Sequence, residues 1–149
     1  MARSTIANGE PMTPRELQAR TKAFALRVIK LVDTLPRSTA GQVVGRQLLR
    51  SATSVGANYR AACRAQSHAE FAAKLSVVVE EADESPYWLE LLHESNLIKP
   101  ERLSDLLNEA NEIVAISVAA RKTAKQAIRT PASSLRVQSS IDNRQSTIL

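Results

Sequence analysis

Residues 13–35 read TPRELQARTKAFALRVIKLVDTL, and this stretch contains the signals of one complete amphipathic helix. Thr13 is a favourable N-cap, Pro14 is harmless in the first turn because its missing N–H would have no helical partner, and Glu16 completes a capping box. The core-facing residues then recur at alternating intervals of four and three, which places them on one helix face. They are Leu17, Thr21, Phe24, Val28, Leu31 and Leu35. Pro36 ends the predicted helix.

Three further segments repeat this spacing, over about residues 39–65, 67–95 and 100–130. Four amphipathic helices joined by short turns predict an all-α fold, an antiparallel up-down-up-down four-helix bundle. We expect the bundle to span residues 13–130, between a flexible N-terminal tail (1–12) and a disordered C-terminal tail (131–149). Gly41 and Gly45, one turn apart near the start of the second helix, predict the close approach of a neighbouring backbone.

The composition agrees with one helical domain. Of the 149 residues, 44% are hydrophobic but only 3% are aromatic, which disfavours a β-sandwich or a β-barrel. No apolar run approaches the roughly 20 residues of a membrane span, and the polar N-terminus carries no export signal. A single cysteine, Cys63, excludes an intramolecular disulfide framework. We therefore expect a cytoplasmic protein that does not enter a membrane.

Charge is strongly segregated along the chain, although the net charge is only +5. Residues 1–65 carry a net charge of +8, residues 66–112 carry −8, and residues 113–149 carry +5. On the second helix, four arginines recur at helical spacing and form one ridge: Arg46, Arg50, Arg60 and Arg64. At 1.5 Å per residue, this arginine ridge is about 27 Å long.

The arginine ridge permits three interpretations, of which the simplest is a solvated face without a ligand. Guanidinium groups bind phosphates in bidentate fashion and polyanions release counterions on binding, so the ridge favours an RNA or DNA backbone as ligand. Arg20 and Arg27 on the first helix extend this candidate surface. Alternatively, the arginines pair with acids of the third helix or of a neighbouring subunit, and the protein is a protein–protein scaffold without a nucleic-acid ligand. No aromatic stacking platform accompanies the ridge, so any nucleic-acid binding should be weakly sequence-specific.

Other features point to self-assembly. The third helix carries an acidic stripe that includes Glu80 and Glu84, and opposite charged stripes on one small chain favour a head-to-tail ring. On the fourth helix, Ile116 and Val118 point away from the predicted core stripe, and a helix that is apolar on two sides usually covers a second surface. We assign these four residues to the subunit interfaces of a homo-oligomeric ring.

The sequence lacks the patterns of catalytic and metal sites. Glu90 and His93 have the Glu-x-x-His spacing of di-iron bundles, but such a site needs a second motif and two more inward carboxylates. Cys63 has no His or Asp near it in the sequence, and we expect it to be a small buried residue. The sequence therefore predicts a protein that is not an enzyme and that has no metal or cofactor.

Residues 49–58 read LRSATSVGAN, and the acidic run EEADES follows at residues 80–85. With Ser67 and Phe71 between them, these residues resemble the four-helix-bundle family named for proteins encoded in 23S ribosomal RNA intervening sequences, over about residues 17–125. Arg50, Ser54 and Asn58 match the second-helix pattern of that family. One departure is that many members have Glu-Gly soon after the Asn, where this chain has two alanines at 61 and 62.

The resemblance implies a small helical protein that assembles as a homopentameric ring. It also implies partners, because a related branch serves as the accessory protein of diversity-generating retroelements. Members of that branch bind a reverse transcriptase and nucleic acid through basic surfaces. The resemblance thus implies a non-enzymatic accessory protein whose partners are its own copies, RNA or DNA, and a reverse transcriptase.

Overall fold

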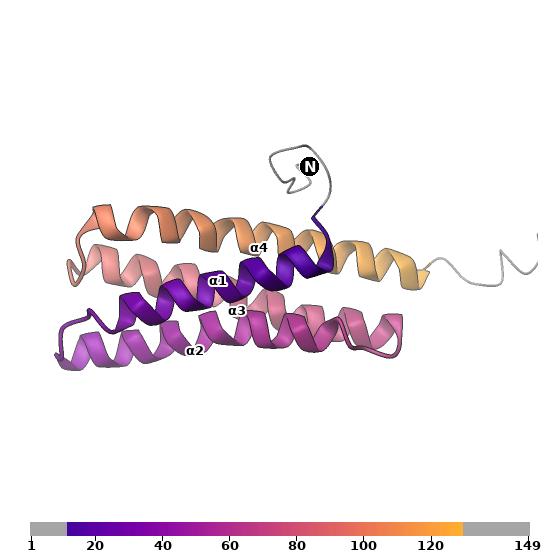
Figure 1. Ribbon diagram of the computed structural model, residues 1–149, viewed down its shortest axis with the longest axis horizontal. Coiled ribbons are helices and arrows are strands. Elements are labelled where there is room, and N and C mark those ends of the chain that lie inside the picture. Colours follow the sequence, from indigo (N-terminus) through magenta and orange to yellow (C-terminus); the bar gives the residue numbers. More distant parts are fainter. Residues whose placement is uncertain (1–11, 130–149) are drawn as a thin grey trace, which may run out of the picture.

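The computed structural model describes residues 12–129, and within this range the chain forms four helices and no strand (Figure 1). The helices are α1 (Pro14–Val32), α2 (Thr39–Ala62), α3 (His68–Glu94) and α4 (Pro100–Arg129). These bounds confirm the four predicted helices to within a few residues. The predicted tails, residues 1–12 and 131–149, lie outside the described part of the chain except for Met12.

Short-range hydrogen bonds cap the first three helices, and those at the start of α1 confirm the predicted capping box. The Thr13 backbone N–H donates to Glu16 Oε2 (2.7 Å), and the Glu16 N–H donates back to Thr13 Oγ1 (3.2 Å). Ser38 caps α2 by accepting from the Gly41 N–H (3.1 Å), and Ser67 caps α3 in the same way. Each bond satisfies an N–H that has no partner within its own helix, so the helix starts follow from local sequence.

Each helix packs against its neighbours in the sequence: α2 contacts α1 and α3, and α3 contacts α2 and α4. The closing contact between α1 and α4 is much smaller than the other three. This is the arrangement of an up-down four-helix bundle, in which short turns make successive helices antiparallel. The apolar faces meet in one core, whose largest fully buried side chains are Phe24, Leu48, Leu75, Leu89, Leu92, Leu103 and Ile113.

Gly41 permits the tight connection between α1 and α2. A Cβ at position 41 would lie 2.2 Å from the Pro36 carbonyl oxygen, which is far closer than real Cβ contacts. A Cβ at Gly45 would lie 2.9 Å from Leu35 Cδ1. The predicted close approach of a backbone is therefore confirmed at Gly41, whereas Gly45 makes room for a side chain instead.

The turn from α3 to α4 begins with a Schellman motif. Asn96 has a φ of 58°, and it is the one non-glycine residue in the range 12–129 with a positive φ. The Leu97 N–H donates to the Leu92 carbonyl oxygen (3.2 Å), and the Asn96 N–H donates to the His93 carbonyl oxygen (3.1 Å). These two bonds satisfy carbonyl groups at the end of α3 and turn the chain back along it.

Candidate functional site

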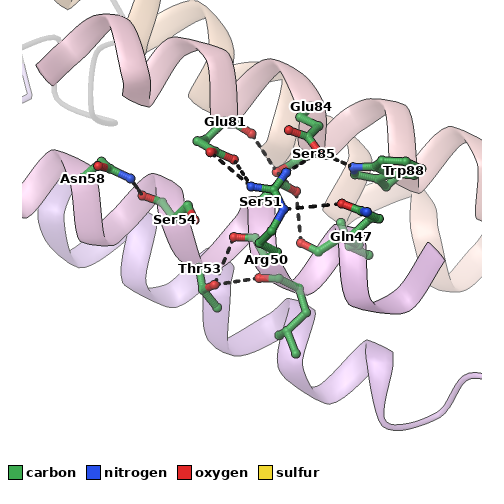
Figure 2. A network of polar contacts seen from close by, with 12 residues as sticks. Gln47, Arg50, Ser51, Thr53, Ser54, Asn58, Glu81, Glu84, Ser85 and Trp88 are labelled. Atoms are coloured by element: carbon green, nitrogen blue, oxygen red, sulfur yellow. Dashed lines mark hydrogen bonds and ion pairs between the residues drawn. The ribbon is translucent and has the colours of Figure 1, made fainter. Parts of the chain in front are cut away.

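A polar cluster joins α2 to α3 around Arg50 (Figure 2). All three guanidinium nitrogens donate: Nε to Gln47 Oε1 (3.4 Å), Nη1 to both carboxylate oxygens of Glu81 (3.2 Å each) and Nη2 to Glu84 Oε1 (2.5 Å). Trp88 Nε1 also donates to Glu84 Oε1 (2.9 Å). The hydrogen bond from Arg50 holds the pKa of Glu84 below its ordinary value, and the same bond raises the pKa of Arg50. Both groups are therefore charged at neutral pH.

Ser51 and Ser85, adjacent in sequence to Arg50 and Glu84, form a buried hydroxyl pair between the same two helices. Ser51 Oγ lies 3.1 Å from the Leu48 carbonyl oxygen, and Ser85 Oγ lies 3.2 Å from the Glu81 carbonyl oxygen. The two Oγ atoms lie 3.0 Å apart, so both hydroxyl protons have acceptors whichever serine donates to the other. This arrangement holds α2 against α3, and we assign it a structural role.

A second arginine cluster ties α1 to α4. Arg20 Nε donates to Glu109 Oε1 (2.6 Å), Nη2 donates to Glu109 Oε2 (3.1 Å), and Nη2 also pairs with Glu112. The hydrogen bond with Glu109 is the largest cause of the raised pKa of Arg20. Because the Arg20 side chain is only 23% exposed, it offers little surface to a ligand and acts across the small contact between α1 and α4.

A groove between α1 and α2 carries the unpaired positive charge of this face. Its volume is about 460 Å³, and it is lined by Gln18, Ala19, Lys22, Ala25, Thr53, Gly56, Ala57, Arg60 and Arg64. Three of these residues are cations, none is an acid, and the alanines and the glycine leave the floor shallow. Within residues 12–129, no ion pair occupies Lys22, Arg60 or Arg64. We call this set of nine lining residues the basic groove.

The rotation of α2 explains why the ridge arginines have different environments. Ten residues separate Arg50 from Arg60, and at 3.6 residues per turn their side-chain directions differ by about 80°. Gly56 marks the side of α2 that faces α1, since it lies against Thr21, and Ser51 marks the side that faces α3. Arg50 stands at the α3 edge of the ridge and Arg60 at the α1 edge. The helical spacing predicted that the four arginines form one ridge. It did not predict that one edge of the ridge lies next to α3 and the other edge next to α1.

The other two predicted cations lie outside the basic groove. Arg46 is exposed near the start of α2, beside the turn from α1. Arg27 is exposed between α1 and α4, where it lines a shallow hollow with Lys30 and Arg102. Within residues 12–129 neither Arg46 nor Arg27 forms an ion pair. Both side chains are therefore available to a ligand.

Lys22 is the one cation of the basic groove that was not predicted from the sequence. Its one sequence signal is its place on the outward face of α1, a property that it shares with most surface lysines. Its position opposite Arg60 and Arg64 depends on how α1 is rotated against α2. The periodicity of the sequence does not determine how one helix is rotated against another.

Two side-chain assignments from the sequence were wrong. Ile116 is 8% exposed and belongs to the core of the chain, so it does not point away from the core as predicted, while its assignment to a subunit interface stays a prediction. The core face of α4 also includes Ile113, so it is wider than the stripe predicted from the sequence, which was Leu103, Leu106, Leu107, Ala110, Val114, Ser117 and Ala124. Cys63 is exposed at the C-cap of α2 rather than buried. Val118 is exposed, as its assignment to a second surface requires.

The acidic residues assigned to subunit contacts differ in their surroundings. Glu84 is bound to Arg50 of the same chain, whereas Glu80 is exposed and has no ion pair within residues 12–129. Glu90 and His93 are exposed on α3, and no group of three or more His, Cys, Asp or Glu residues in the described range is placed to hold a metal ion. In that same range, every helix is too short or too polar to cross a bilayer.

Comparison with known proteins gives a family match over most of the helical domain. Residues 15–119 match the family model described as 23S rRNA-intervening sequence protein. A search of the curated proteins gives no match. Among solved structures, the chain is similar to a protein of unknown function from the S23 ribosomal protein family of Bacteroides thetaiotaomicron, with 36% identity and a TM-score of 0.69. That likeness covers 74% of this chain and 99% of the other.

Proposed function

This chain belongs to the 23S rRNA-intervening sequence protein family, and from that premise we propose that it is a non-enzymatic accessory protein that binds the backbone of RNA or DNA through the basic groove. The observation that carries the proposal is the convergence of Lys22, Arg60 and Arg64 on one groove without an acid among its lining residues. Cations that lack carboxylate partners can exchange bound water for phosphate oxygens, and the nucleic acid then releases counterions.

The groove favours contact with phosphates over recognition of bases. Its polar residues other than the cations are Gln18, whose amide can donate to a phosphate oxygen as readily as to a base, and Thr53, whose hydroxyl donates to the Leu49 carbonyl oxygen (2.7 Å). None of its lining residues is aromatic, so it offers no surface on which a base could stack. Arg46 lies further along the same helix and extends the contact. The proposed binding is therefore weakly sequence-specific.

We also propose that copies of this chain assemble into a homo-oligomer. A homo-oligomeric ring, such as a homopentamer, would present one basic groove per subunit, and several grooves on one nucleic acid would raise the overall affinity above that of a single groove. A reverse transcriptase is the proposed protein partner of such an accessory factor. Its binding is tested by co-purification of the two full-length proteins.

The test of the basic groove is a salt titration of RNA and DNA binding by fluorescence anisotropy. The variant carries Lys22→Gln, Arg60→Gln and Arg64→Gln. Each lost phosphate contact flattens the plot of log affinity against log salt by about 0.7 to 0.9, so we expect a slope smaller by about 2 and a large loss of affinity at low salt. The control variant removes three exposed cations elsewhere: Lys99, Lys125 and Arg129.

Equal effects of the two triple variants would contradict the groove as the binding site. A second outcome would favour the scaffold function instead: no binding of nucleic acid by the wild-type protein, together with a change of mass in light scattering when the groove arginines are replaced. In that case the same arginines hold subunits together. The two functions therefore give opposite results in the same pair of measurements.

A further inference from the structure

Arg50 differs from the groove arginines because each of its guanidinium nitrogens already donates a hydrogen bond, although the side chain is accessible. Its side chain is 50% exposed, so a phosphate could reach it from solvent. Its three nitrogens nevertheless all donate to acceptors of the same chain, on Gln47, Glu81 and Glu84. Four hydrogen bonds therefore engage four of the five N–H groups of this exposed arginine and leave one N–H, on Nη2, without an acceptor in the described range.

The two carboxylates outweigh the charge of the arginine that they bind. One guanidinium lies among the ionised groups of Glu81 and Glu84, so the cluster as a whole is negative. Trp88 donates to Glu84 and fixes it in this position, and the side chain of Glu81 is only 19% exposed. A phosphate that approached Arg50 would meet repulsion, and a bidentate contact would have to displace a hydrogen bond that Arg50 already makes.

We propose that Glu81 and Glu84 withhold Arg50 from nucleic acid and thereby set the edge of the phosphate-binding surface on α2. This inference rests on the proposed function of the basic groove. Phosphate groups then contact the α1 side of the arginine ridge, at Arg60 and Arg64. They do not contact Arg50 on the α3 side. Neutralising the two carboxylates releases one further phosphate-binding arginine.

The experiment compares two pairs of substitutions on α3 that change the net charge equally. Glu81→Gln with Glu84→Gln frees Arg50, whereas Glu80→Gln with Asp83→Asn removes two exposed acids that form no ion pair within residues 12–129. The probe is a fluorescent RNA duplex without a defined sequence. We expect the first pair to raise affinity about threefold to tenfold beyond the control pair. We also expect it to steepen the salt slope by about 0.7 to 0.9, the contribution of one added phosphate.

Adding Arg50→Gln to the first pair should abolish the gain, and Arg50→Gln alone should leave the affinity of the wild-type protein nearly unchanged. Circular dichroism shows whether each variant is folded. If the first pair does not fold, Glu84→Gln against Glu80→Gln gives the same comparison. Equal responses of the two pairs, in a protein that binds RNA through the groove, would overturn this inference alone. Absence of RNA binding in the wild type and in all variants would overturn the proposed function and this inference with it.

Discussion

Ser51 Oγ and Ser85 Oγ lie 3.0 Å apart between α2 and α3, and neither side chain is reached by water. Serine is small, so this hydrogen bond lets the two helices approach closely and fixes how one is placed along the other. Arg50 precedes Ser51 and Glu84 precedes Ser85, so the buried bond also sets the partners of the ion pair above it. The polar cluster is thus built on an uncharged contact inside the bundle.

Replacing either serine by alanine should destabilise the bundle by about 1 kcal/mol, because the remaining hydroxyl keeps a backbone carbonyl as acceptor and is not left without a partner. In a double-mutant cycle of Ser51→Ala and Ser85→Ala, the double variant should lose less than the sum of the single losses, by about 0.5 to 1 kcal/mol. Urea denaturation measures all four free energies of unfolding. Strict additivity would show that the two hydroxyls do not interact.

The bond from Arg50 makes the charge state of Glu84 depend on pH in a defined direction. The folded-state pKa of Glu84 lies below the ordinary value of 4.5, so its stabilising contribution is complete above pH 4.5 and is lost as the pH falls through the folded-state value. Trp88 donates to Glu84 and is the one tryptophan of the chain, so its fluorescence reports the titration. We expect a midpoint below pH 4.5 in the wild type and a higher midpoint in Arg50→Gln.

The control for this titration is Glu80→Gln, which changes an exposed acid of the same helix and should keep the wild-type midpoint. The fluorescence must be followed only in the pH range where circular dichroism still shows a folded protein. An unchanged midpoint in Arg50→Gln would mean that the arginine does not stabilise the ionised form of Glu84.

Two glycines of α2 should respond oppositely to alanine. At Gly41 the new Cβ would lie 2.2 Å from the Pro36 carbonyl oxygen, so the turn must move, and we expect a loss of about 2 kcal/mol or more. At Gly56 the nearest atom is Thr21 Oγ1 at 3.5 Å, an ordinary contact, so higher helix propensity should stabilise the fold by about 0.5 to 1 kcal/mol. Thermal unfolding separates the two outcomes, and a destabilised Gly56→Ala would show that α1 cannot accommodate the added methyl.

Arg20 should matter for stability and not for nucleic acid. Replacement by glutamine removes the hydrogen-bonded pair with Glu109 across the α1–α4 contact, and we expect a loss of about 1 to 2 kcal/mol. Arg15→Gln is the control, since Arg15 is exposed on the same helix and forms no ion pair within residues 12–129. Urea denaturation and RNA binding are measured on both variants. If Arg20→Gln loses more RNA affinity than Arg15→Gln does, then Arg20 belongs to the binding surface.

The helices were predictable because their signals are local. The capping box of Thr13 and Glu16 and the alternating apolar spacing each involve residues within one or two turns of one another. The predicted core stripe of α4 was mostly correct but too narrow, because Ile113 and Ile116 are buried beside it. How wide the buried face of a helix is depends on where the other helices lie.

The candidate site was less predictable because it depends on the rotation of one helix against another. Four arginines at regular spacing look equivalent in the sequence, yet Arg50 meets two carboxylates 31 and 34 positions away while Arg60 meets none in the described range. The acidic run at residues 80–85 indicated that such pairing was possible. It did not indicate which arginine would be paired.

The small contact between α1 and α4 has a consequence for the motions of the protein. A helix held mainly by one neighbour opens locally at a lower free energy than the helices between two neighbours, so the amide hydrogens of α1 should exchange with solvent before those of α2 and α3. Lys22 belongs to α1 and moves when this helix opens, whereas Arg60 and Arg64 belong to α2. A polyanion that contacts both helices would therefore hold α1 against α2 and suppress this local opening. Bound nucleic acid would then be detected as slower deuterium uptake along α1, without any label on the nucleic acid.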